Sequence, residues 1–149
     1  MKKIKYRKFK ATDKKIVSEL IKELYKEVSE KNKISNENIN KTFVEFLRYS
    51  KSGRILVLEN KKQIIGYCLL VNYWSNEFGG NVLNVDEIYI KPQFRGKNIG
   101  TNFIKNLIEN KFMKAVAFQL EVKPLNNKAI KLYKKIGFKL SRNSHLIYY

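Results

Sequence analysis

The chain has 149 residues, of which 44% are hydrophobic, enough to bury the core of one domain and too many for a disordered chain. Its 31 Lys and Arg against 13 Asp and Glu give a formal net charge of +18, a field that attracts anions. One cysteine, Cys68, excludes an internal disulfide framework and a cysteine-based zinc site, and no apolar run reaches the roughly 18 residues that a membrane span needs.

The first half of the chain predicts a strand, two helices and a hairpin. Alternation of apolar and charged residues predicts a strand at 4–9, and a three-to-four-residue apolar period predicts two helices. The first helix begins at Thr12 or Asp13 and ends near Lys31, and the second begins at Ser35 or Asn36 and ends before 50–53. Two apolar runs then predict a hairpin with strands at 55–58 and 64–71. Gly66, inside the second run, indicates a bulge or a close backbone approach.

The second half alternates strands and helices. In chain order we expect a loop rich in aromatic residues at 73–80, a strand at 82–90, a helix at 98–110, a strand at 115–122, a helix at 127–136 and closing strands at 138–140 and 145–148. Gly137 is placed to end the last helix in a left-handed conformation. No repeat or linker divides the chain, so the pattern predicts one layered α+β domain over residues 1–149.

The segment 85–101 carries the clearest functional signal. A strand runs into a tight loop with Gly96 and Gly100, and a helix then begins. The first N–H groups of a helix have no partner within it, so such a loop can hold a phosphate or pyrophosphate, and Arg95 and Lys97 add positive charge. An ordinary strand-to-helix turn with surface charges is the alternative. The loop matches neither the Walker motif nor the dinucleotide-binding glycine motif.

Two segments resemble motifs of the Gcn5-related N-acetyltransferase (GNAT) superfamily. The run Arg95-Gly-Lys-Asn-Ile-Gly100 resembles its Gln/Arg-x-x-Gly-x-Gly/Ala motif, whose amides bind the pyrophosphate of acetyl-coenzyme A. Asn98 stands where that motif usually has Gly, and Asn is the non-glycine residue best suited to a left-handed conformation, so we expect the loop to keep its shape. The segment 126–138 resembles the family's Asn-x-x-Ala-x-x-x-Tyr-x-x-x-Gly-Phe motif.

The resemblance implies a fold, a cofactor and a reaction. The expected fold is a mixed, mostly antiparallel twisted sheet of about six to seven strands flanked by four helices. The implied reaction is direct transfer of an acetyl group from acetyl-coenzyme A to a primary amine of a small molecule or peptide. The residues implied for acetyl-coenzyme A are the main chain of Ile88, Tyr89 and Ile90, the loop residues Arg95, Gly96, Lys97, Asn98, Ile99, Gly100 and Thr101, and the side chains of Asn126 and Tyr133.

Three residues are implied in catalysis. Tyr133 is the candidate general acid, since a phenol can donate a proton at neutral pH. Asp86 and Glu87 are the candidate base or amine-positioning pair, because adjacent carboxylates in an apolar strand are costly unless they are used or paired. Strand alternation sends the two to opposite faces, so at most one faces the site unless a bulge intervenes. Of the two, we favour Glu87 for its length.

The amine acceptor is expected between the first two helices and the aromatic loop. The residues proposed to contact it are Tyr25, Phe43, Trp74, Glu77 and Phe78. Packing of a hydrophobic loop on the helices is the equal alternative. Cys68 is expected in the core, and no metal is expected.

The charge leaves other partners open. Only five basic residues are Arg, and the lysines are spread along the whole chain, which favours a solvated surface over nucleic acid or a membrane as partner. No apolar segment follows the basic start, so we expect no secretory signal and a cytoplasmic location. Family members of this size often form homodimers. A non-catalytic acyl-coenzyme A binder or sensor, and a basic nucleic-acid-associated module, remain the alternative functions.

Overall fold

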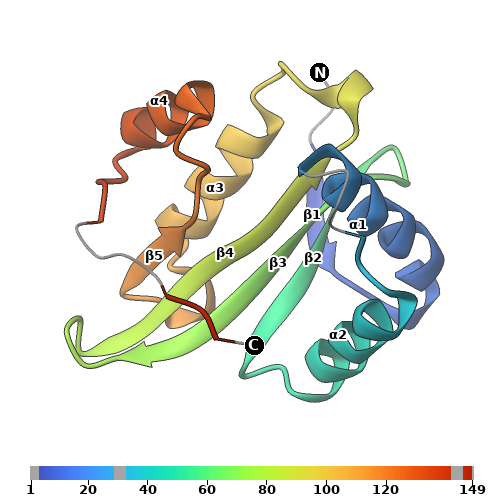
Figure 1. Ribbon diagram of the computed structural model, residues 1–149, viewed down its shortest axis with the longest axis horizontal. Coiled ribbons are helices and arrows are strands. Elements are labelled where there is room, and N and C mark those ends of the chain that lie inside the picture. Colours follow the sequence, from blue (N-terminus) through green and yellow to red (C-terminus); the bar gives the residue numbers. More distant parts are fainter. Residues whose placement is uncertain (1–3, 29–32, 142–145, 149) are drawn as a thin grey trace.

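The strands form one mixed sheet in the order β1-β2-β3-β4-β5, with β1 to β4 antiparallel and β5 parallel to β4 (Figure 1). The computed structural model describes residues 4–28, 33–141 and 146–148. The strands are β1 (Lys5–Lys8), β2 (Gly53–Asn60), β3 (Gln63–Ser75), β4 (Gly80–Ile90) and β5 (Ala117–Leu120). The helices are α1 (Lys14–Val28), α2 (Asn36–Arg48), α3 (Ile99–Glu109) and α4 (Asn127–Ile136), with 3-10 turns η1 (Ala11–Asp13), η2 (Pro92–Phe94) and η3 (Phe112–Lys114).

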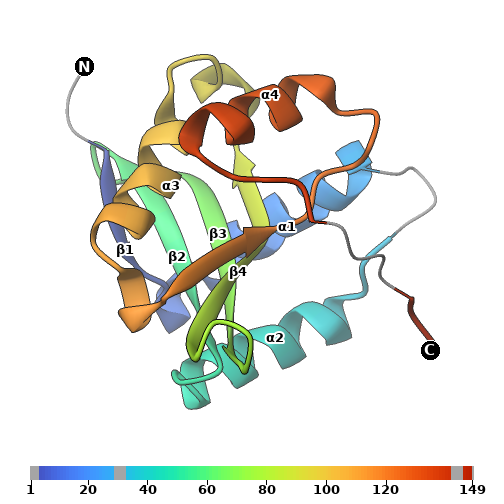
Figure 2. The same ribbon diagram turned by 90° about the vertical axis from the view of Figure 1, so that its left-hand side faces the viewer.

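The helices cover both faces of the sheet, α1 and α2 on one and α3 and α4 on the other (Figure 2). The alternation of β3 divides the core between them. Cys68 and Leu70 pack toward α3, whereas Tyr67 and Leu69 pack toward α1 and α2. This is the predicted layered α+β architecture. None of the helices in the described ranges is long and apolar enough to cross a membrane.

Two helix ends follow the predicted caps, whereas α1 begins at Lys14, after Thr12 and Asp13 of the 3-10 turn η1. Ser35 accepts a hydrogen bond from the Asn38 N–H at 3.1 Å, and α2 begins at the next residue. Gly137 ends α4 in the left-handed conformation, with φ at 116°. The Phe138 N–H donates to the Tyr133 carbonyl at 3.0 Å, so the chain closes the helix with hydrogen bonds typical of a left-handed cap.

The prediction for Gly66 is confirmed in both of its forms. Leu58 pairs with Gly66 and Glu59 with Ile64, so Ile65 is an extra residue in β3. A Cβ at Gly66 would collide with the Tyr89 carbonyl oxygen of the neighbouring strand. The bulge lies in the pairing with β2, and the missing side chain of Gly66 lets β4 run close beside β3.

The strand count was predicted too high, because the described part of the chain contains five strands. Residues 138–140 form no strand, since Phe138 instead caps α4 and packs against Tyr133 with ring centroids 5.8 Å apart. The predicted closing strand at 145–148 is also absent over 146–148, whose side chains are almost fully exposed. His145 lies outside the described residues, as do residues 29–32 at the predicted end of the first helix.

The predicted aromatic loop at 73–80 was also too long. Strand β3 continues to Ser75 and β4 begins at Gly80, which leaves a turn of residues 76–79. Tyr73 pairs with Val82, and Trp74 pairs with Asn81. Aromatic residues favour strands, so the hairpin extends through them.

Candidate active site

A bulge in β4 organises the candidate site. Leu70 pairs with Val85 and Leu69 pairs with Glu87, so Asp86 is an extra residue with no partner on β3. Val85 packs in the core under α3, and Glu87 reaches hydroxyl groups on the α1 side. The bulge that would let both carboxylates lie near one site is therefore present. Asp86 stays exposed and accepts a long hydrogen bond of 3.5 Å from the Asn84 amide.

The same bulge marks the end of the ladder between β4 and β5. Pairing runs from Val82 with Ala117 to Val85 with Leu120, and the rest of β4 has no neighbour on that edge in the described part of the chain. The Lys91 N–H donates to the Ile65 carbonyl. In an antiparallel pair the main-chain groups of successive residues point alternately toward and away from the partner strand, so this bond sets which residues of β4 point to β3. The main-chain groups of Ile88 and Ile90 therefore point to the open edge, while those of Tyr89 point to β3.

Glu87 is held between two phenols. The Tyr25 hydroxyl donates to Oε1 at 2.9 Å, and the Tyr67 hydroxyl donates to Oε2 at 2.8 Å. Burial raises the pKa of Glu87, the two tyrosine hydrogen bonds lower it, and the nearby charge of Asp86 raises it, with a net shift upward. Burial and the charge of Glu121 also raise the pKa of Asp86. Carboxylates with raised pKa values are suited to accept a proton near neutral pH.

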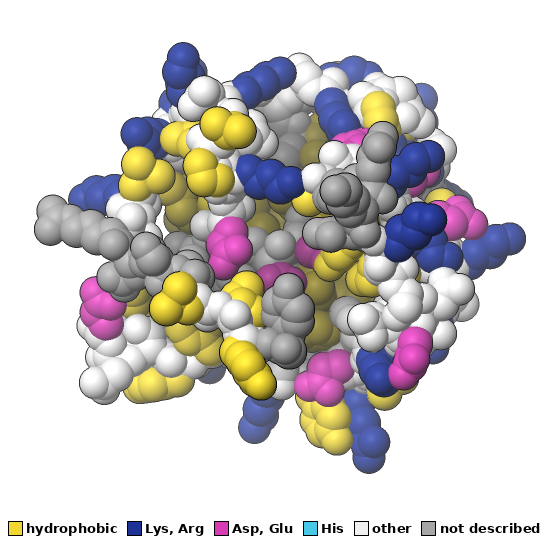
Figure 3. Space-filling model, viewed as in Figure 1, with side chains coloured by type: hydrophobic (Ala, Val, Ile, Leu, Met, Phe, Trp, Pro, Cys, Tyr) yellow, Lys and Arg dark blue, Asp and Glu magenta, His cyan; other side chains and the backbone are white. Residues whose placement is uncertain are grey.

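Tyr133 lies on α4, on the other face of β4 from Glu87. Its ring packs on the α3 core, and burial, with a smaller effect of Cys68, raises the pKa of its hydroxyl. No hydrogen bond to this hydroxyl occurs within residues 4–28, 33–141 and 146–148. Acid and base candidates thus flank the open edge from opposite faces. Figure 3 shows this side of the molecule hollowed near its middle, with acidic side chains beside the hollow.

The loop after β4 has the shape that the motif predicts. Asn98 adopts the left-handed conformation, with φ at 57°, which confirms that expectation, and Gly96 has φ at 76°. The Asn98 side chain does not cap α3, and the first helical hydrogen bond runs from the Asn102 N–H to the Asn98 carbonyl. The N–H groups of residues 96–101 therefore find no acceptor in the described part of the chain. This arrangement suits an anion.

Three predicted contacts for the cofactor also have partners within the protein. The Lys97 ammonium donates to the Gln93 carbonyl at 3.1 Å, which leaves two of its three N–H groups free. The Arg95 guanidinium bonds the Ile90 carbonyl and Glu27 of α1. The Asn126 side chain caps α4 by accepting from the Ala129 N–H at 3.1 Å, which leaves its amide N–H₂ free to donate.

The predicted acceptor residues are not brought together. Tyr25 contacts Glu87, but Phe43 is 1% exposed in the core and stacks on Phe9 with ring centroids 4.8 Å apart. Trp74 is exposed and lies five residues along β3 from Leu69, the partner of Glu87, or roughly 17 Å away at the usual strand rise. The other predicted contacts, Glu77 and Phe78, lie in the same distant turn.

Sequence reasoning missed Tyr67, Glu121 and the α1 carboxylates Glu23 and Glu27. Tyr67 follows the apolar alternation of β3, so its pattern indicated core packing. Its hydroxyl reaches Glu87 only because of the register between β3 and β4.

No group of three His, Cys, Asp or Glu side chains that could hold a metal occurs among the described residues.

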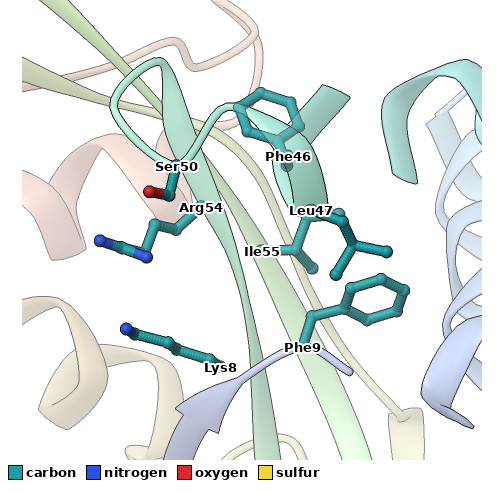
Figure 4. Close-up of a pocket in the computed structure, with 7 residues that line it drawn as sticks. All are labelled: Lys8, Phe9, Phe46, Leu47, Ser50, Arg54 and Ile55. Atoms are coloured by element: carbon teal, nitrogen blue, oxygen red, sulfur yellow. The ribbon is translucent and has the colours of Figure 1, made fainter. Parts of the chain in front are cut away.

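Two hollows lie away from Glu87 and Tyr133. One, of about 130 Å³, lies between α2 and β2 (Figure 4), and the other, of about 410 Å³, lies between α1 and the end of β4. The first is lined by Lys8, Phe9, Phe46, Leu47, Ser50, Arg54 and Ile55. The second is lined by Glu23, Lys26, Glu27, Tyr89, Lys91, Pro92 and Gln93. Neither contains the catalytic candidates, so the open edge of β4 remains the site that the chemistry favours.

Comparison with known proteins gives one consistent family. The sequence model of the acetyltransferase (GNAT) family matches residues 14–138. Thialysine N-epsilon-acetyltransferase from Mus musculus is 40% identical over 75 residues, which are 50% of this chain and 44% of that enzyme. The match therefore spans less than half of that relative.

Solved structures share the whole fold at low identity. A possible acetyltransferase from Clostridium difficile 630 has a TM-score of 0.82 at 21% identity, covering 98% of this chain and 97% of that one. An aminoglycoside N-acetyltransferase in complex with CoA has a TM-score of 0.77 at 16% identity, covering 99% of this chain and 93% of that one. These two likenesses concern the fold alone.

Proposed function

Because the chain belongs to the acetyltransferase (GNAT) family, we propose that it transfers an acetyl group from acetyl-coenzyme A to a primary amine by direct attack, with both substrates bound. The bulge at Asp86 is the observation that carries this proposal. It ends the β4–β5 ladder, leaves main-chain groups free for a donor molecule, and sets a carboxylate beside the same edge.

The residues present fit acetyl-coenzyme A. The unpartnered N–H groups of 96–101 would hold the pyrophosphate, assisted by the Lys97 ammonium. The N–H and C=O of Ile88 and the N–H of Ile90 would pair with the amide groups of the pantetheine arm, as an added strand does. The amide N–H₂ of Asn126 is free to donate to the same arm. When bound, acetyl-coenzyme A supplies an activated thioester carbonyl and a thiolate leaving group.

Proton transfer falls to side chains on both faces of β4. An alkyl amine is mostly protonated at neutral pH, so Glu87 accepts the proton that the amine must lose, directly or through water. A C–N bond then forms, the C–S bond breaks, and the second proton of the attacking nitrogen passes through water to replace the one that Tyr133 gives up. Tyr133 donates the proton that the leaving sulfur takes up, and its raised pKa keeps its hydroxyl protonated for that step.

The acceptor class follows from charge near the site. Asp86, Glu87 and Glu121 place negative charge beside the open edge, which favours a cationic amine. The mouse relative is named as an acetyltransferase for the epsilon amine of thialysine. We therefore propose an amine at the end of a flexible chain, in a small molecule or a peptide. A cytoplasmic location, supported by the free buried thiol of Cys68, and a single domain over residues 1–149 are part of the proposal.

A pair of variants at Gly100 tests the donor site. A Cβ at this position would meet only the Ile90 Cδ1 atom, at 3.4 Å, so Gly100→Ala should fold and bind acetyl-coenzyme A. Gly100→Trp should fold but fill the space in front of the unpartnered N–H groups. Calorimetry should show micromolar binding for the wild type and Gly100→Ala, and none for Gly100→Trp.

Retained binding by Gly100→Trp would remove the pyrophosphate from this loop. The next step is a panel of amines, assayed for release of coenzyme A. Binding without turnover of any amine, together with no rate effect of Tyr133→Phe, would favour a non-catalytic acyl-coenzyme A sensor. Light scattering of the same samples decides whether the chain is a homodimer.

A further inference from the structure

Arg95 follows η2 and directly precedes the residues with unpartnered N–H groups, and its side chain contacts β4 and α1. Its Nε donates to the Ile90 carbonyl at 2.6 Å, and its Nη2 donates to both carboxylate oxygens of Glu27, at 2.9 and 3.0 Å. The guanidinium also lies over the Tyr89 ring, 5.0 Å from its centre. Three different partners from β4 and α1 therefore hold this one side chain.

The α1 side of this contact is itself anchored. The Tyr89 hydroxyl lies 3.2 Å from a Glu27 oxygen and 3.0 Å from a Glu23 oxygen, and its single proton is shared between the two carboxylates. The Tyr89 ring is 3% exposed, and burial together with these two carboxylates raises the pKa of its hydroxyl, which stays a donor. Arg95, Glu27, Tyr89 and Glu23 thus form a chain of contacts, the Arg95 clamp, that joins the start of the loop to α1.

The clamp fixes where the guanidinium points through Nε and Nη2, while Nη1 has no partner among the described residues. Moving the guanidinium to an anion would leave the Glu27 carboxylate without its cation and the Ile90 carbonyl without its donor. Ile90 and Arg95 are the two ends of the turn formed by η2, so the Nε bond fixes the turn across its base. The clamp therefore sets where the loop and the first turn of α3 begin.

We propose that Arg95 is a positioning residue that ties the donor loop to α1 through Glu27, and that it is not a phosphate ligand. This inference rests on the proposed binding of acetyl-coenzyme A at 96–101. It assigns phosphate contact to main-chain N–H groups and Lys97, and gives α1 a part in donor binding.

Glu27→Gln separates the two roles of Arg95, because they predict effects of opposite sign. If Arg95 binds phosphate, loss of Glu27 frees the guanidinium and removes a negative charge, so acetyl-coenzyme A binds as well or more tightly. If Arg95 positions the loop, loss of the Glu27 carboxylate that its Nη2 group bonds weakens binding by roughly three- to tenfold. Glu37→Gln is the matched control, because it removes the same charge from an exposed ion pair with Lys41 on α2.

Calorimetry with acetyl-coenzyme A should show the weaker binding for Glu27→Gln and wild-type binding for Glu37→Gln. In the steady state, the KM for acetyl-coenzyme A should rise by the same factor while kcat stays within about twofold. Unchanged or tighter binding by Glu27→Gln would overturn the proposal. The wild-type titration tests the proposed function by itself, which fails if the wild type does not bind acetyl-coenzyme A. The comparison of variants tests only the role of Arg95.

Arg95→Lys gives a second and independent measurement. A lysine keeps the charge but has a single nitrogen, so it cannot reproduce the separate Nε bond to the Ile90 carbonyl and Nη2 bonds to Glu27. The positioning role therefore predicts that Arg95→Lys weakens binding about as much as Glu27→Gln, and that the double variant is no weaker than either single one. Near-wild-type binding by Arg95→Lys would mean that charge alone matters and would overturn the proposal. Thermal melts of each variant control for unfolding.

Discussion

At the scale of single residues, the site is built around the Glu87 carboxylate, which two phenols from different elements hold in place. Tyr25 comes from α1 and Tyr67 from β3, and each donates to a different oxygen. Both bonds favour the charged form of the carboxyl group, and burial opposes them. The balance leaves a carboxyl group, the proposed base, whose pKa depends on these neighbours.

Tyr25→Phe should raise the pKa of Glu87 further, because it removes a hydrogen bond to the charged form. The base is then protonated over more of the acidic range, so the acid limb of kcat/KM should move to higher pH while the plateau changes little. At pH values below that limb, we expect kcat/KM to fall roughly tenfold, in line with the loss of one hydrogen bond to a charged group. A pH–rate profile measures the shift.

Tyr73→Phe is the matched control, because its hydroxyl donates to Gln119 and not to Glu87. It should keep the wild-type profile. If Tyr25→Phe also keeps that profile, Glu87 is not the group that titrates in the rate.

Tyr133→Phe should lower kcat by roughly 10²-fold, because the hydroxyl is the proposed proton donor to the leaving sulfur. The ring contact with Phe138 does not need the hydroxyl, so acetyl-coenzyme A binding and the melting temperature should stay close to wild type. Single-turnover kinetics with saturating donor measures the step. Unchanged turnover would remove Tyr133 from the role of acid.

At the scale of elements, a buried ion pair ties the beginning of α1 to the sheet. Arg7 of β1 donates to Asp13 at 2.8 and 3.1 Å and to Glu59 of β2 at 2.8 Å. Asp13 also accepts from the Lys10 N–H, and its side chain is 8% exposed. Burial raises the pKa of Asp13, but its hydrogen bonds to Arg7 and Lys10 outweigh it and lower the pKa overall.

Asp13→Asn should therefore destabilise the fold by about 2–3 kcal/mol at pH 7, because it removes one partner from a mostly buried pair. Because its pKa is lower in the folded state, ionised Asp13 stabilises the fold at pH values above its unfolded-state pKa of about 3.9. That stabilisation is lost as the pH falls through the folded-state pKa. The difference between wild type and variant should thus shrink at low pH. Urea unfolding at pH 7 and below about pH 4 measures it, and an equal difference at both would contradict the ion-pair explanation.

The elements differ in how far local sequence determines them. The helices were predictable because the apolar period and the caps at Ser35 and Gly137 lie within each segment. The bulge at Asp86 was not, since an extra residue exists only relative to the register of β3. The prediction of a strand at 138–140 was wrong for a similar reason, because an apolar run does not indicate that its first residue will cap a helix.

Features of the candidate site also differ in how far local sequence predicts them. The loop motif predicted the left-handed Asn98, since that property belongs to the loop itself. The phenol Tyr67 and the α1 partner of Arg95 come from segments 20 and 68 residues distant along the chain from the groups they contact. Neither contact leaves a local pattern, so the structure was needed to find them.

At the scale of the whole molecule, positive charge far exceeds the pairing available to it. The chain has 31 basic and only 13 acidic side chains, so there are too few carboxylates to pair with most of the lysines. We expect a short RNA duplex to bind weakly at about 50 mM salt and to lose tenfold or more in affinity by about 200 mM, as non-specific binding does. Acetyl-coenzyme A, held largely by oriented N–H groups, should lose much less.

Calorimetry at these two salt concentrations, with both ligands, makes the comparison. Tight RNA binding that survives the higher salt, with no binding of acetyl-coenzyme A, would instead favour a nucleic-acid module. In that case the basic surface would be the functional feature, and the loop at 96–101 an ordinary turn.

The extra residue in β4 has a genetic consequence. Loss of the Asp86 codon would make Val85 and Glu87 neighbours, and each would keep its present face, because regular alternation already places them on opposite sides. The shortened strand would match β3 residue for residue, and its ladder with β5 could continue past Val85. One triplet of bases thus separates a regular β4 from a bulged strand whose edge lies open beyond Val85.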